Sequence, residues 1–522
     1  MAGRTKGALM VCGTTSNAGK STVVAGLCRV LARRGVRVAP FKAQNMSLNS
    51  VVTPSGHEIG RAQAAQAAAA GVVPEAAMNP VLLKPMSDHT SNVIVLGEPH
   101  SVQSAAEYQD SKQALFDVAA DALAGLRRRF DVVLLEGAGS PTEINLIRHD
   151  IVNLRLAARA GVPAIVVGDI DLGGVFAALH GTVDLLPHDL RAHVRGFVVN
   201  KFRGDPSLLS DGFSVLEQRC GVPTLGVLPF LAGIDVDAED SLALDRIRSV
   251  VSTGDSSRTE GGASSAPEAP WPGDSLDVAV IRFPRISNFT DLDPLAHEPG
   301  VAVRFVSDVA SLGRPDLVVL PGTRSTVDDL DWLRATGLDR AIGSIGTVVL
   351  GICGGYQMMG SIIEDGVESP RTLVSGLGWL PVTTAFRVSK VTTQQNGTAL
   401  GHPVSGYQIH HGRVTPHDGS PFVVLKAGVD GSAVDGVSTE RCAGTTLHGI
   451  FENDGFRADF LAGTAEVAGK RFVASGVPFA SIREAQFDRI ADAIETHLDM
   501  RAIEKLISQA ADSGSLSSEA SG

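Results

Sequence analysis

The chain has 522 residues and a formal net charge of −12 at pH 7, with 57 acidic side chains against 45 lysines and arginines. This length exceeds one ordinary hydrophobic core, so two or three domains are expected. The acidic balance disfavours nucleic acids and anionic membranes as partners, no apolar run of about 18 residues is present to span a membrane, and the five scattered cysteines fit a reducing cytoplasm. We therefore expect a cytoplasmic protein with a small substrate.

Composition divides the chain into four segments. Residues 1–250 alternate short apolar runs with Ala-, Leu- and Arg-rich stretches, which predicts a parallel sheet with helices on both faces. Residues 251–274 are rich in Ser, Gly, Pro and Ala, as in a flexible linker. Residues 275–500 restart the α/β pattern and then become Gly- and Thr-rich, which indicates mixed or antiparallel structure. Residues 501–522 are expected to form a tail that is disordered at its end.

The first apolar run ends in "GTTSNAGKST", residues 13–22, which differs from the usual phosphate loop. The usual loop has four residues between its glycines, whereas five separate Gly13 from Gly19 here. The loop lies between a predicted strand and a predicted helix, where backbone N–H groups can hold phosphates. Lys20 would reach the outer phosphates and Ser21 would ligate Mg²⁺; the alternative is a glycine turn with a surface lysine. The predicted ATP-binding residues of this loop are Asn17, Gly19, Lys20, Ser21 and Thr22.

Polar residues follow later apolar runs of the same segment. Glu136, in "DVVLLEGAGS", is expected to hold the Mg²⁺ shell, with a helix N-cap as the alternative. Asn200, in "GFVVNKF", could read an adenine edge or could cap a loop. Asp169 and Asp171 precede paired glycines and are either functional or structural. These positions all lie where a parallel sheet binds ligands, beyond the carboxyl ends of its strands.

In the second half, "VVLGICGGYQMMG" places Cys353 between glycines, after an apolar run and before a predicted helix. This is the pattern of a nucleophile elbow, in which glycines permit the turn and the helix N-terminus favours the thiolate. The alternative is a cysteine that serves as a small apolar residue. The remaining cysteines lack this context and are predicted to be structural: Cys12, Cys28, Cys220 and Cys442.

A thiolate nucleophile needs a base, and two strings supply candidates. "GTTLHGIFEN" contains His448, and "GYQIHHG" contains His410 and His411. The pattern alone does not choose between them. The string "VVLPGTRSTVDDL" contains Gly322, which is a candidate for offering a backbone N–H to an oxyanion or for a plain turn.

Two family resemblances give these motifs a context. The spacing of "GTTSNAGKST", together with "EGAGS", resembles dethiobiotin synthetase and its relatives, which phosphorylate a carboxylate with ATP. The strings "PFKAQNMSLNS", "EIGRAQAAQAAAA" and "DIDLGGVFA" resemble the cobyric acid synthases, glutamine-hydrolysing amidotransferases of cobalamin biosynthesis, over about residues 7–495. The resemblance implies an α/β protein with an N-terminal P-loop, dethiobiotin synthetase-like amidoligase domain and a C-terminal class I glutamine amidotransferase-like domain. It also implies ATP and Mg²⁺ as cofactors.

The resemblance assigns roles to particular residues. Lys42, in "PFKAQN", would lie near the phosphate and the substrate carboxylate, with an exposed strand-end lysine as the alternative, and Glu58 matches a second acid only weakly. Class I glutaminase domains carry their histidine near the C-terminal end, which favours His448 over its competitors. Their third member stands two residues beyond the histidine, but Ile450 occupies that place, so Glu452 or no residue at all is the orienting group. The oxyanion and glutamine would be held by Gly322, Gly354 and Gln357.

The function implied is amidation of carboxylates b, d, e and g of adenosylcobyrinic acid a,c-diamide, with ammonia from L-glutamine. Two alternatives stay open. One is the related enzyme that makes the a,c-diamide; the other is a partitioning-type ATPase switch with a silent glutaminase fold. The sequence does not predict the order of amidations, the route of ammonia or the oligomeric state.

Overall fold

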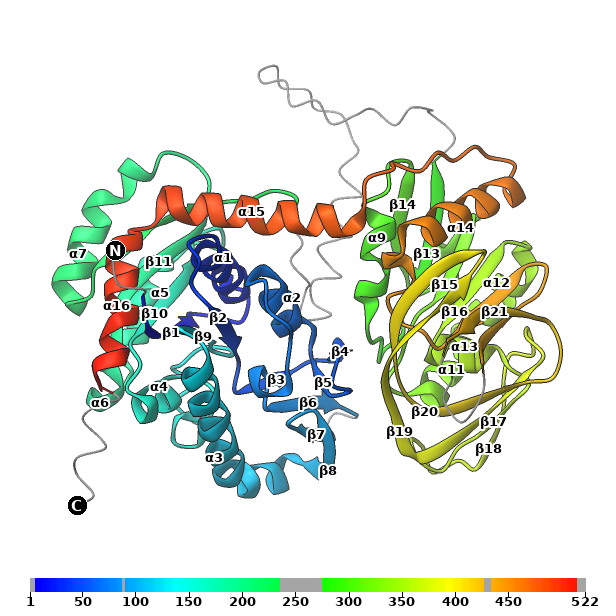
Figure 1. Ribbon diagram of the computed structural model, residues 1–522, viewed down its shortest axis with the longest axis horizontal. Helices are drawn as coiled ribbons and strands as arrows, with labels where there is room; N and C mark the ends of the chain where they lie inside the picture. Colours follow the sequence, from blue (N-terminus) through cyan, green and yellow to red (C-terminus); the bar gives the residue numbers. More distant parts are fainter. Residues whose placement is uncertain (1–4, 87–89, 235–274, 427–432, 514–522) are drawn as a thin grey trace. The chain divides into compact units, whose positions relative to one another are not determined.

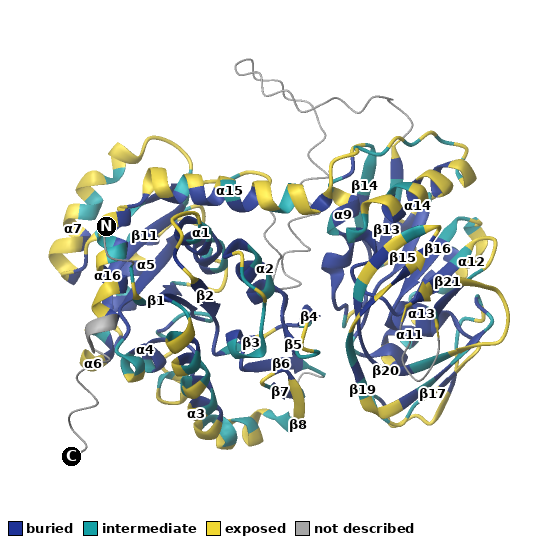
Figure 2. Ribbon diagram, viewed as in Figure 1, coloured by how far each residue is buried: buried dark blue, intermediate teal, exposed yellow. Residues whose placement is uncertain are grey.

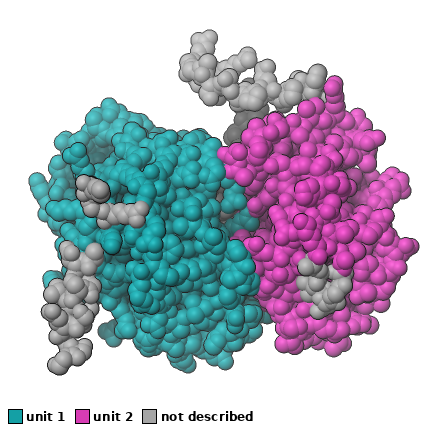
Figure 3. All heavy atoms as spheres, in the orientation of Figure 1, with its two compact units in different colours: residues 1–47, 53–237, 483–522 teal, residues 48–52, 238–482 magenta. Residues whose placement is uncertain are grey.

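The computed structural model describes residues 5–86, 90–234, 275–426 and 433–513. They form two compact units, coloured separately in Figure 3. Of the described residues, unit 1 contains 5–47, 53–86, 90–234 and 483–513. Unit 2 contains 48–52, 275–426 and 433–482. The predicted linker at 251–274 and the end of the predicted tail lie outside the described residues.

Unit 1 is built on a six-stranded sheet with the order β12-β11-β10-β1-β9-β2, in which every pairing is parallel. The middle strands are buried on both faces (Figure 2), as their continuous apolar sequences require. The predicted parallel sheet is confirmed. Its strands are β1 (Gly7–Gly13), β2 (Val38–Phe41), β9 (Val132–Glu136), β10 (Ala164–Asp169), β11 (Val194–Phe202) and β12 (Thr224–Pro229).

Helices cover both faces of this sheet (Figure 1), and each face has its own hydrophobic cluster. The helices are α1 (Lys20–Arg33), α2 (Arg61–Ala69), α3 (Ala105–Arg129), α4 (Leu154–Ala160), α5 (Val175–Asp184), α6 (His188–Arg191) and α7 (Ser210–Cys220). A second, four-stranded sheet has the order β3-β6-β7-β8. Its strands are β3 (Gln44–Met46), β6 (Val81–Pro85), β7 (Thr90–Val95) and β8 (Glu98–Ser104), and a short strand β5 (Glu58–Gly60) precedes α2.

The last two helices, α15 (Phe479–His497) and α16 (Met500–Ser513), correct the predicted boundary at residue 500. From Arg483 onward the described chain belongs to unit 1, and the predicted tail begins with a helix. Ile490 lies directly against α1, because a Cβ added to Gly26 would meet its Cγ2 at 2.5 Å. Arg29 of α1 donates to Asp488 at 2.7 Å. The helical apolar pattern of this segment buries its stripe against unit 1, so composition alone misplaced it.

Unit 2 is built on an eleven-stranded sheet. Its first part, β14-β13-β15-β16-β23, is parallel, and β22, β21, β19 and β20 continue it in antiparallel pairings, as the Gly- and Thr-rich sequence predicted. The strands are β13 (Leu276–Ile281), β14 (Val301–Val306), β15 (Leu317–Leu320), β16 (Val348–Ile352), β17 (Ile362–Glu364), β18 (Leu373–Ser375), β19 (Val382–Ala399), β20 (His402–Pro416), β21 (Ser420–Leu425), β22 (Val434–Ser438) and β23 (Cys442–Thr445).

The short elements of unit 2 sit at the ends of these strands. They are η4 (Phe289–Leu292), α9 (Asp293–Ala296), α10 (Val309–Leu312), α11 (Thr326–Ala335), α12 (Leu338–Ile345), α13 (Gly354–Met359), η6 (Ile450–Glu452) and α14 (Asp454–Val467). Strand β4 (Ser50–Val52) also belongs to unit 2. Among the residues that the structure describes, none of the helices combines the length and apolar character that a membrane crossing requires.

Shortening Ile490 tests the assignment of the last helices to unit 1. Ile490 is 1% exposed, so Ile490→Ala should leave a cavity and lower the stability of unit 1 by about 2–5 kcal/mol. Amide hydrogen exchange read by mass spectrometry should then quicken in α1 and leave unit 2 unchanged. The exposed Thr496→Ala on the same helix is the control, with an effect within about 0.5 kcal/mol. Faster exchange confined to unit 2 would contradict the assignment.

Candidate active site

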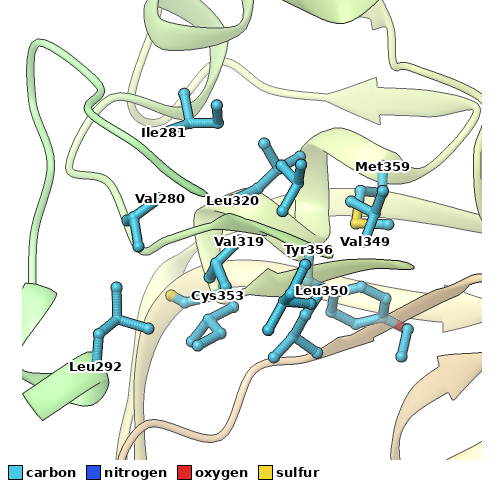
Figure 4. Packing of buried hydrophobic residues seen from close by; sticks show 14 of the residues in the cluster. Val280, Ile281, Leu292, Val319, Leu320, Val349, Leu350, Cys353, Tyr356 and Met359 are labelled. Atoms are coloured by element: carbon cyan, nitrogen blue, oxygen red, sulfur yellow. The ribbon is translucent and has the colours of Figure 1, made fainter. Parts of the chain in front are cut away.

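Cys353 occupies the sharp turn between β16 and α13 that the sequence predicted. Its backbone has φ 51° and ψ −111°, which an L-residue adopts only where the surrounding structure enforces it. Gly355 makes this turn possible, because a Cβ there would lie 1.9 Å from the carbonyl oxygen of Leu320. The Cys353 N–H donates to the oxygen of Thr445 at 2.8 Å. Cys353 is 6% exposed and shares a buried cluster with Val319 (Figure 4).

His448 follows the end of β23 and is held by a carboxylate that sequence analysis missed. Its Nδ1 donates to Oδ2 of Asp291 at 2.6 Å, and the N–H of Gly449 donates to Oδ1 of the same residue at 3.0 Å. Asp291 belongs to η4 and lies 157 residues from His448 in the chain. Both side chains are nearly inaccessible, with His448 1% and Asp291 2% exposed. The orienting group in the structure is therefore Asp291, which was not among the alternatives that the sequence offered, Glu452 or no residue.

The charges around His448 favour its protonated form. Burial lowers the pKa of His448, but the Asp291 carboxylate and the Cys353 sulfur, by charge and by hydrogen bonding, outweigh it and raise the pKa to about 10. Since Nδ1 is engaged by Asp291, Nε2 is the nitrogen left for Cys353. The arrangement is suited to an imidazolium beside a thiolate, the form in which cysteine is nucleophilic.

The two competing histidines on β20 are engaged elsewhere. His410 Nδ1 lies 2.7 Å from the carbonyl oxygen of Gly412, and burial is the main cause that lowers the pKa of His410 to about 3. His411 Nδ1 lies 3.0 Å from the carbonyl oxygen of Arg387. Neither histidine is among the groups that raise the pKa of His448. The geometry thus agrees with the choice of His448.

Tyr407 packs directly on His448 and also contacts Ser50, a residue distant from it in the sequence. The two rings stack at 5.2 Å between centroids, and the two backbones exchange hydrogen bonds of 2.8 and 3.1 Å. The Tyr407 hydroxyl donates to the carbonyl oxygen of Ser50 at 3.0 Å, and the N–H of Ser50 donates to Asn288 at 3.0 Å. Asn288 is the residue before η4, which carries Asp291. The segment Leu48–Val52 is therefore part of the packing around the His448–Asp291 pair.

A buried carboxylate also fixes the strand that leads to His448. Asp435 of β22 accepts hydrogen bonds from the hydroxyl groups of Thr445 and Thr446 and from the N–H of Thr446. The amide of Gln408 on β20 donates to the same carboxylate at 3.2 Å. Burial raises the pKa of Asp435 despite these donors. The network joins three strands just before His448 and limits how far its imidazole can move.

The predicted oxyanion and glutamine residues lie around this centre. A Cβ added to Gly322 would meet Cε1 of His448 at 3.1 Å, so Gly322 is close to the imidazole. Gly354 follows Cys353 at the first position of α13, and the N–H of Gln357 donates to the Cys353 oxygen at 2.9 Å. The described backbone hydrogen bonds include none donated by Gly322 or Gly354. Their role in holding an oxyanion stays a prediction.

Lys20 of the phosphate loop in unit 1 donates hydrogen bonds to carbonyl oxygens of the same loop and of a neighbouring one. Lys20 Nζ donates to the carbonyl oxygens of Thr15, Ser16 and Gly139 at 2.8, 3.1 and 3.1 Å. Gly19, which precedes α1, has φ 98°, and an added Cβ would lie 2.1 Å from Nδ2 of Asn200. The loop can therefore take this path only with glycine at that position.

Glu136 ends β9 opposite this loop, and three side-chain donors contact its carboxylate. Ser21 Oγ and Lys42 Nζ contact Oε1 at 2.8 and 3.1 Å, and the amide of Gln66 donates to Oε2. Burial raises the pKa of Glu136, but Lys42, the Gln66 and Ser21 hydrogen bonds and Lys20 outweigh it and hold the pKa below its ordinary value. The structure brings together the predicted residues Ser21, Lys42 and Glu136, and it adds Gln66, which the sequence did not single out.

The remaining predicted residues of unit 1 have mainly loop contacts. Asn200 Nδ2 donates to the oxygen of Ala18 at 2.9 Å, which is the loop-capping alternative. Asn17 accepts from Lys201 at 2.7 Å through its backbone oxygen, and Lys201 also pairs with Asp169. Thr22 lies in the first turn of α1. The Asn200 side chain holds the loop in this structure, and its predicted contact with adenine stays a prediction.

Two other candidates have structural partners. Glu58 is 1% exposed and forms an ion pair with Lys84 at 2.8 Å. Cys12 is fully buried beside the loop, and burial is the main cause that raises the pKa of its thiol to about 12. A thiol with that pKa is not a nucleophile at neutral pH, in agreement with the predicted structural role.

Comparison with known families identifies the class of both units. Residues 9–243 match a family model described as a CobQ/CobB/MinD/ParA nucleotide binding domain. Residues 277–456 match one described as a CobB/CobQ-like glutamine amidotransferase domain. The protein is thus an enzyme that joins a nucleotide-binding unit to a glutamine amidotransferase unit, as the fold and both sites indicate.

Full-length relatives narrow this class to one family. The cobyric acid synthase of Rhodococcus jostii (strain RHA1) is 52% identical over 98% of this chain and 97% of its own length. Those of Streptomyces avermitilis and Nocardia farcinica are 52% and 50% identical over 97% and 98% of this chain, and 98% of each relative is covered. The chain belongs to the cobyric acid synthase family, which confirms the resemblance seen in its motifs. A solved glutamine amidotransferase matches 36% of this chain and 98% of its own at 16% identity and a TM-score of 0.30, which adds nothing to the assignment.

Replacing Asp291 by asparagine tests the His448–Asp291 contact. Asp291→Asn should lower glutamine hydrolysis on the order of 10²- to 10⁴-fold, because the amide cannot stabilise the imidazolium. The pKa of His448 should fall, because the Asp291 carboxylate is one of the groups that raise it. NMR signals of the imidazole, followed against pH, measure this fall.

The matched control is Asp293→Asn, two residues further along. Asp293 is not among the groups that shift the pKa of His448, so its variant should keep both the rate and the pKa of His448. An Asp291→Asn protein that hydrolyses glutamine at the wild-type rate would show that the carboxylate is not needed for orientation.

Proposed function

We propose that the protein amidates carboxylates b, d, e and g of adenosylcobyrinic acid a,c-diamide with ATP and glutamine, giving adenosylcobyric acid. The observation that carries the proposal is the presence of two complete sites in one chain of this family. In unit 2, His448 contacts both Cys353 and the carboxylate of Asp291. In unit 1, Ser21 of the phosphate loop donates to the buried carboxylate of Glu136. One site would release ammonia and the other would activate the acceptor.

In unit 2, Cys353 attacks the side-chain carboxamide carbon of glutamine as a thiolate. His448, protonated and oriented by Asp291, gives its proton to the departing ammonia, which leaves a thioester on Cys353. Water then hydrolyses the thioester to glutamate, with His448 as the base. The N–H groups of Gly322 and Gly354 would stabilise the oxyanion in both steps, and Gln357 would contact the bound glutamine.

In unit 1, a corrinoid carboxylate takes the terminal phosphoryl group of ATP, and ammonia displaces phosphate to form the amide. Lys20 would bind the outer phosphates once its contacts with the loop carbonyls are exchanged for them. Lys42, held against Glu136, would balance charge between the phosphoryl group and the acceptor carboxylate. Asn17, Gly19 and Thr22 would line the nucleotide's path along the loop.

The donor set of unit 1 fits Mg²⁺. Ser21 Oγ and Glu136 Oε1 lie 2.8 Å apart, and the described residues hold no group of three or more His, Cys, Asp or Glu side chains suited to a metal. A hydroxyl and one carboxylate suit an ion that takes its other ligands from phosphates and water. Ser21 would bind the ion directly and Glu136 would hold it directly or through water, and the ion would neutralise charge on the phosphates.

Two rival functions are separated by simple assays. An a,c-diamide synthase would convert cobyrinic acid and leave the a,c-diamide unchanged, which mass spectrometry of the products distinguishes. An ATPase switch with a silent glutaminase would release no glutamate from glutamine. The buried Cys353, His448 and Asp291 contacts favour an active glutaminase.

Removing Lys20 tests the nucleotide site. Lys20→Ala should abolish amidation with either glutamine or ammonium as the nitrogen source, because no acyl phosphate forms, while glutamine hydrolysis persists. Ser21→Ala should instead raise the Mg²⁺ concentration needed for half-maximal rate, since one ligand among several is lost. Amidation at the wild-type rate by Lys20→Ala at ordinary ATP concentrations would rule out this site.

Removing Cys353 tests the division of labour between the units. Alanine offers no nucleophile, so Cys353→Ala should lose glutamine-dependent synthesis completely and keep synthesis with ammonium salts. The ammonium-dependent rate should rise with pH because more free NH₃ is present. Cys442→Ala is the control and should retain both reactions. Loss of the ammonium-dependent reaction in a folded Cys353→Ala protein would place both steps in one site.

A further inference from the structure

Two buried polar atoms beside the glutaminase centre have no hydrogen-bond partner in the described part of the chain. They are Nε2 of His410, whose residue is 9% exposed, and Nε2 of Gln357, whose residue is 2% exposed. Both lie against Gly412 of β20. His410 Nδ1 is 2.7 Å from the Gly412 oxygen, and a Cβ added to Gly412 would lie 2.6 Å from Gln357 Nε2. Buried polar atoms are paired in most proteins, so such a pair calls for a ligand.

The hydrogen bond to Gly412 decides what His410 can offer. A carbonyl oxygen only accepts, so Nδ1 of His410 carries the proton and donates it to Gly412. In the neutral ring Nε2 is then an acceptor with a free lone pair. The low pKa of His410, caused mainly by burial, agrees with a neutral ring at physiological pH. Gln357 Nε2 is a donor, because its Oε1 accepts from Thr326 at 3.3 Å.

This acceptor and donor lie close to the catalytic cysteine and histidine. Gln357 is one helical turn after Cys353, and its N–H donates to the Cys353 oxygen. His410 lies three residues after Tyr407 on β20, and the Tyr407 ring stacks on His448 at 5.2 Å between centroids. A ligand that reaches Cys353 with one end could therefore meet His410 and Gln357 with the other.

We propose that His410 is the residue that recognises the α-ammonium group of glutamine. His410 Nε2 accepts a hydrogen bond from the ammonium, and Gln357 Nε2 donates one to the α-carboxylate. An α-amino acid carries a donor and an acceptor on the same carbon, which matches two neighbouring side-chain atoms of opposite kind. The inference rests on the proposed glutaminase function and assigns to His410 a role in specificity, separate from the base.

Two substitutions separate the two nitrogens of His410. His410→Asn can keep a donor to Gly412 at the position of Nδ1 but has no atom at the position of Nε2. His410→Gln places a polar atom near the position of Nε2 and should restore part of the recognition. Tyr356→Phe is a matched control, because it removes another buried polar atom without a partner from the neighbouring helix position.

The substrates compared are glutamine and glutaramate, which has the carboxamide and the carboxylate but no α-ammonium group. In wild type, glutamine should be hydrolysed with a kcat/KM at least about tenfold above that of glutaramate. His410→Asn should raise the KM for glutamine about ten- to a hundredfold, leave kcat within about twofold, and leave the kcat/KM for glutaramate unchanged. Tyr356→Phe should behave like wild type with both substrates.

Other outcomes would overturn the assignment. An equal loss with both substrates would mean that His410 supports the fold or the carboxamide, and no loss with either would mean that Nε2 is met by water. Amide hydrogen exchange of unit 2 in the same proteins shows whether each variant is folded. Failure of the proposed function is seen separately, as wild-type protein that releases no glutamate from glutamine.

Discussion

The buried pairing of His448 with Asp291 is the constraint on which unit 2 depends. An imidazolium that is 1% exposed is stable only with a charged partner, and a lone buried carboxylate would be equally costly. Each partner is therefore fixed by its own element. Asp291 belongs to η4, which begins directly after Asn288, whereas His448 follows β23 and stacks on Tyr407. The contact therefore joins the segment after β13, which carries Asp291, to His448, which lies beside β20 and follows β23.

Unit 1 meets the same physical problem with a different solution. Glu136 is 1% exposed at the end of β9 and forms an ion pair with Lys42 at 3.1 Å. Lys42 and the neighbouring donors hold the pKa of Glu136 below its ordinary value, so the carboxylate stays ionised and can serve as a fixed charge beside the phosphates. In unit 2 the partner is a histidine that must give up its proton during the reaction. A fixed pair and a titrating pair thus suit phosphoryl transfer and amide hydrolysis respectively.

The sequence predicted the parts of these sites that local pattern encodes. Cys353 and the Gly19–Ser21 loop are each marked by glycines that a turn needs, within a few residues of the functional side chain. Asp291 could not be found in this way, because its partner is 157 residues distant and "FTDLDP" contains no motif. Gln66 was missed for the same reason, and α16 was missed because its Ser-rich end hid its apolar stripe. Contacts that depend on tertiary structure leave no fixed spacing in the chain.

The histidines of β20 and of the segment after β23 show what tertiary structure adds to a motif. By local sequence pattern alone, before the family resemblance is considered, His410 and His448 are equivalent candidates for a base. In the structure the pKa of His448 is raised to about 10 by Asp291 and Cys353 against burial, while burial lowers the pKa of His410 to about 3 despite the hydrogen bond with Gly412. One imidazole is thereby kept as a proton carrier and the other as a neutral acceptor. Environments that separate two identical groups in this way assign different chemical tasks to them, which no reading of the motif alone could do.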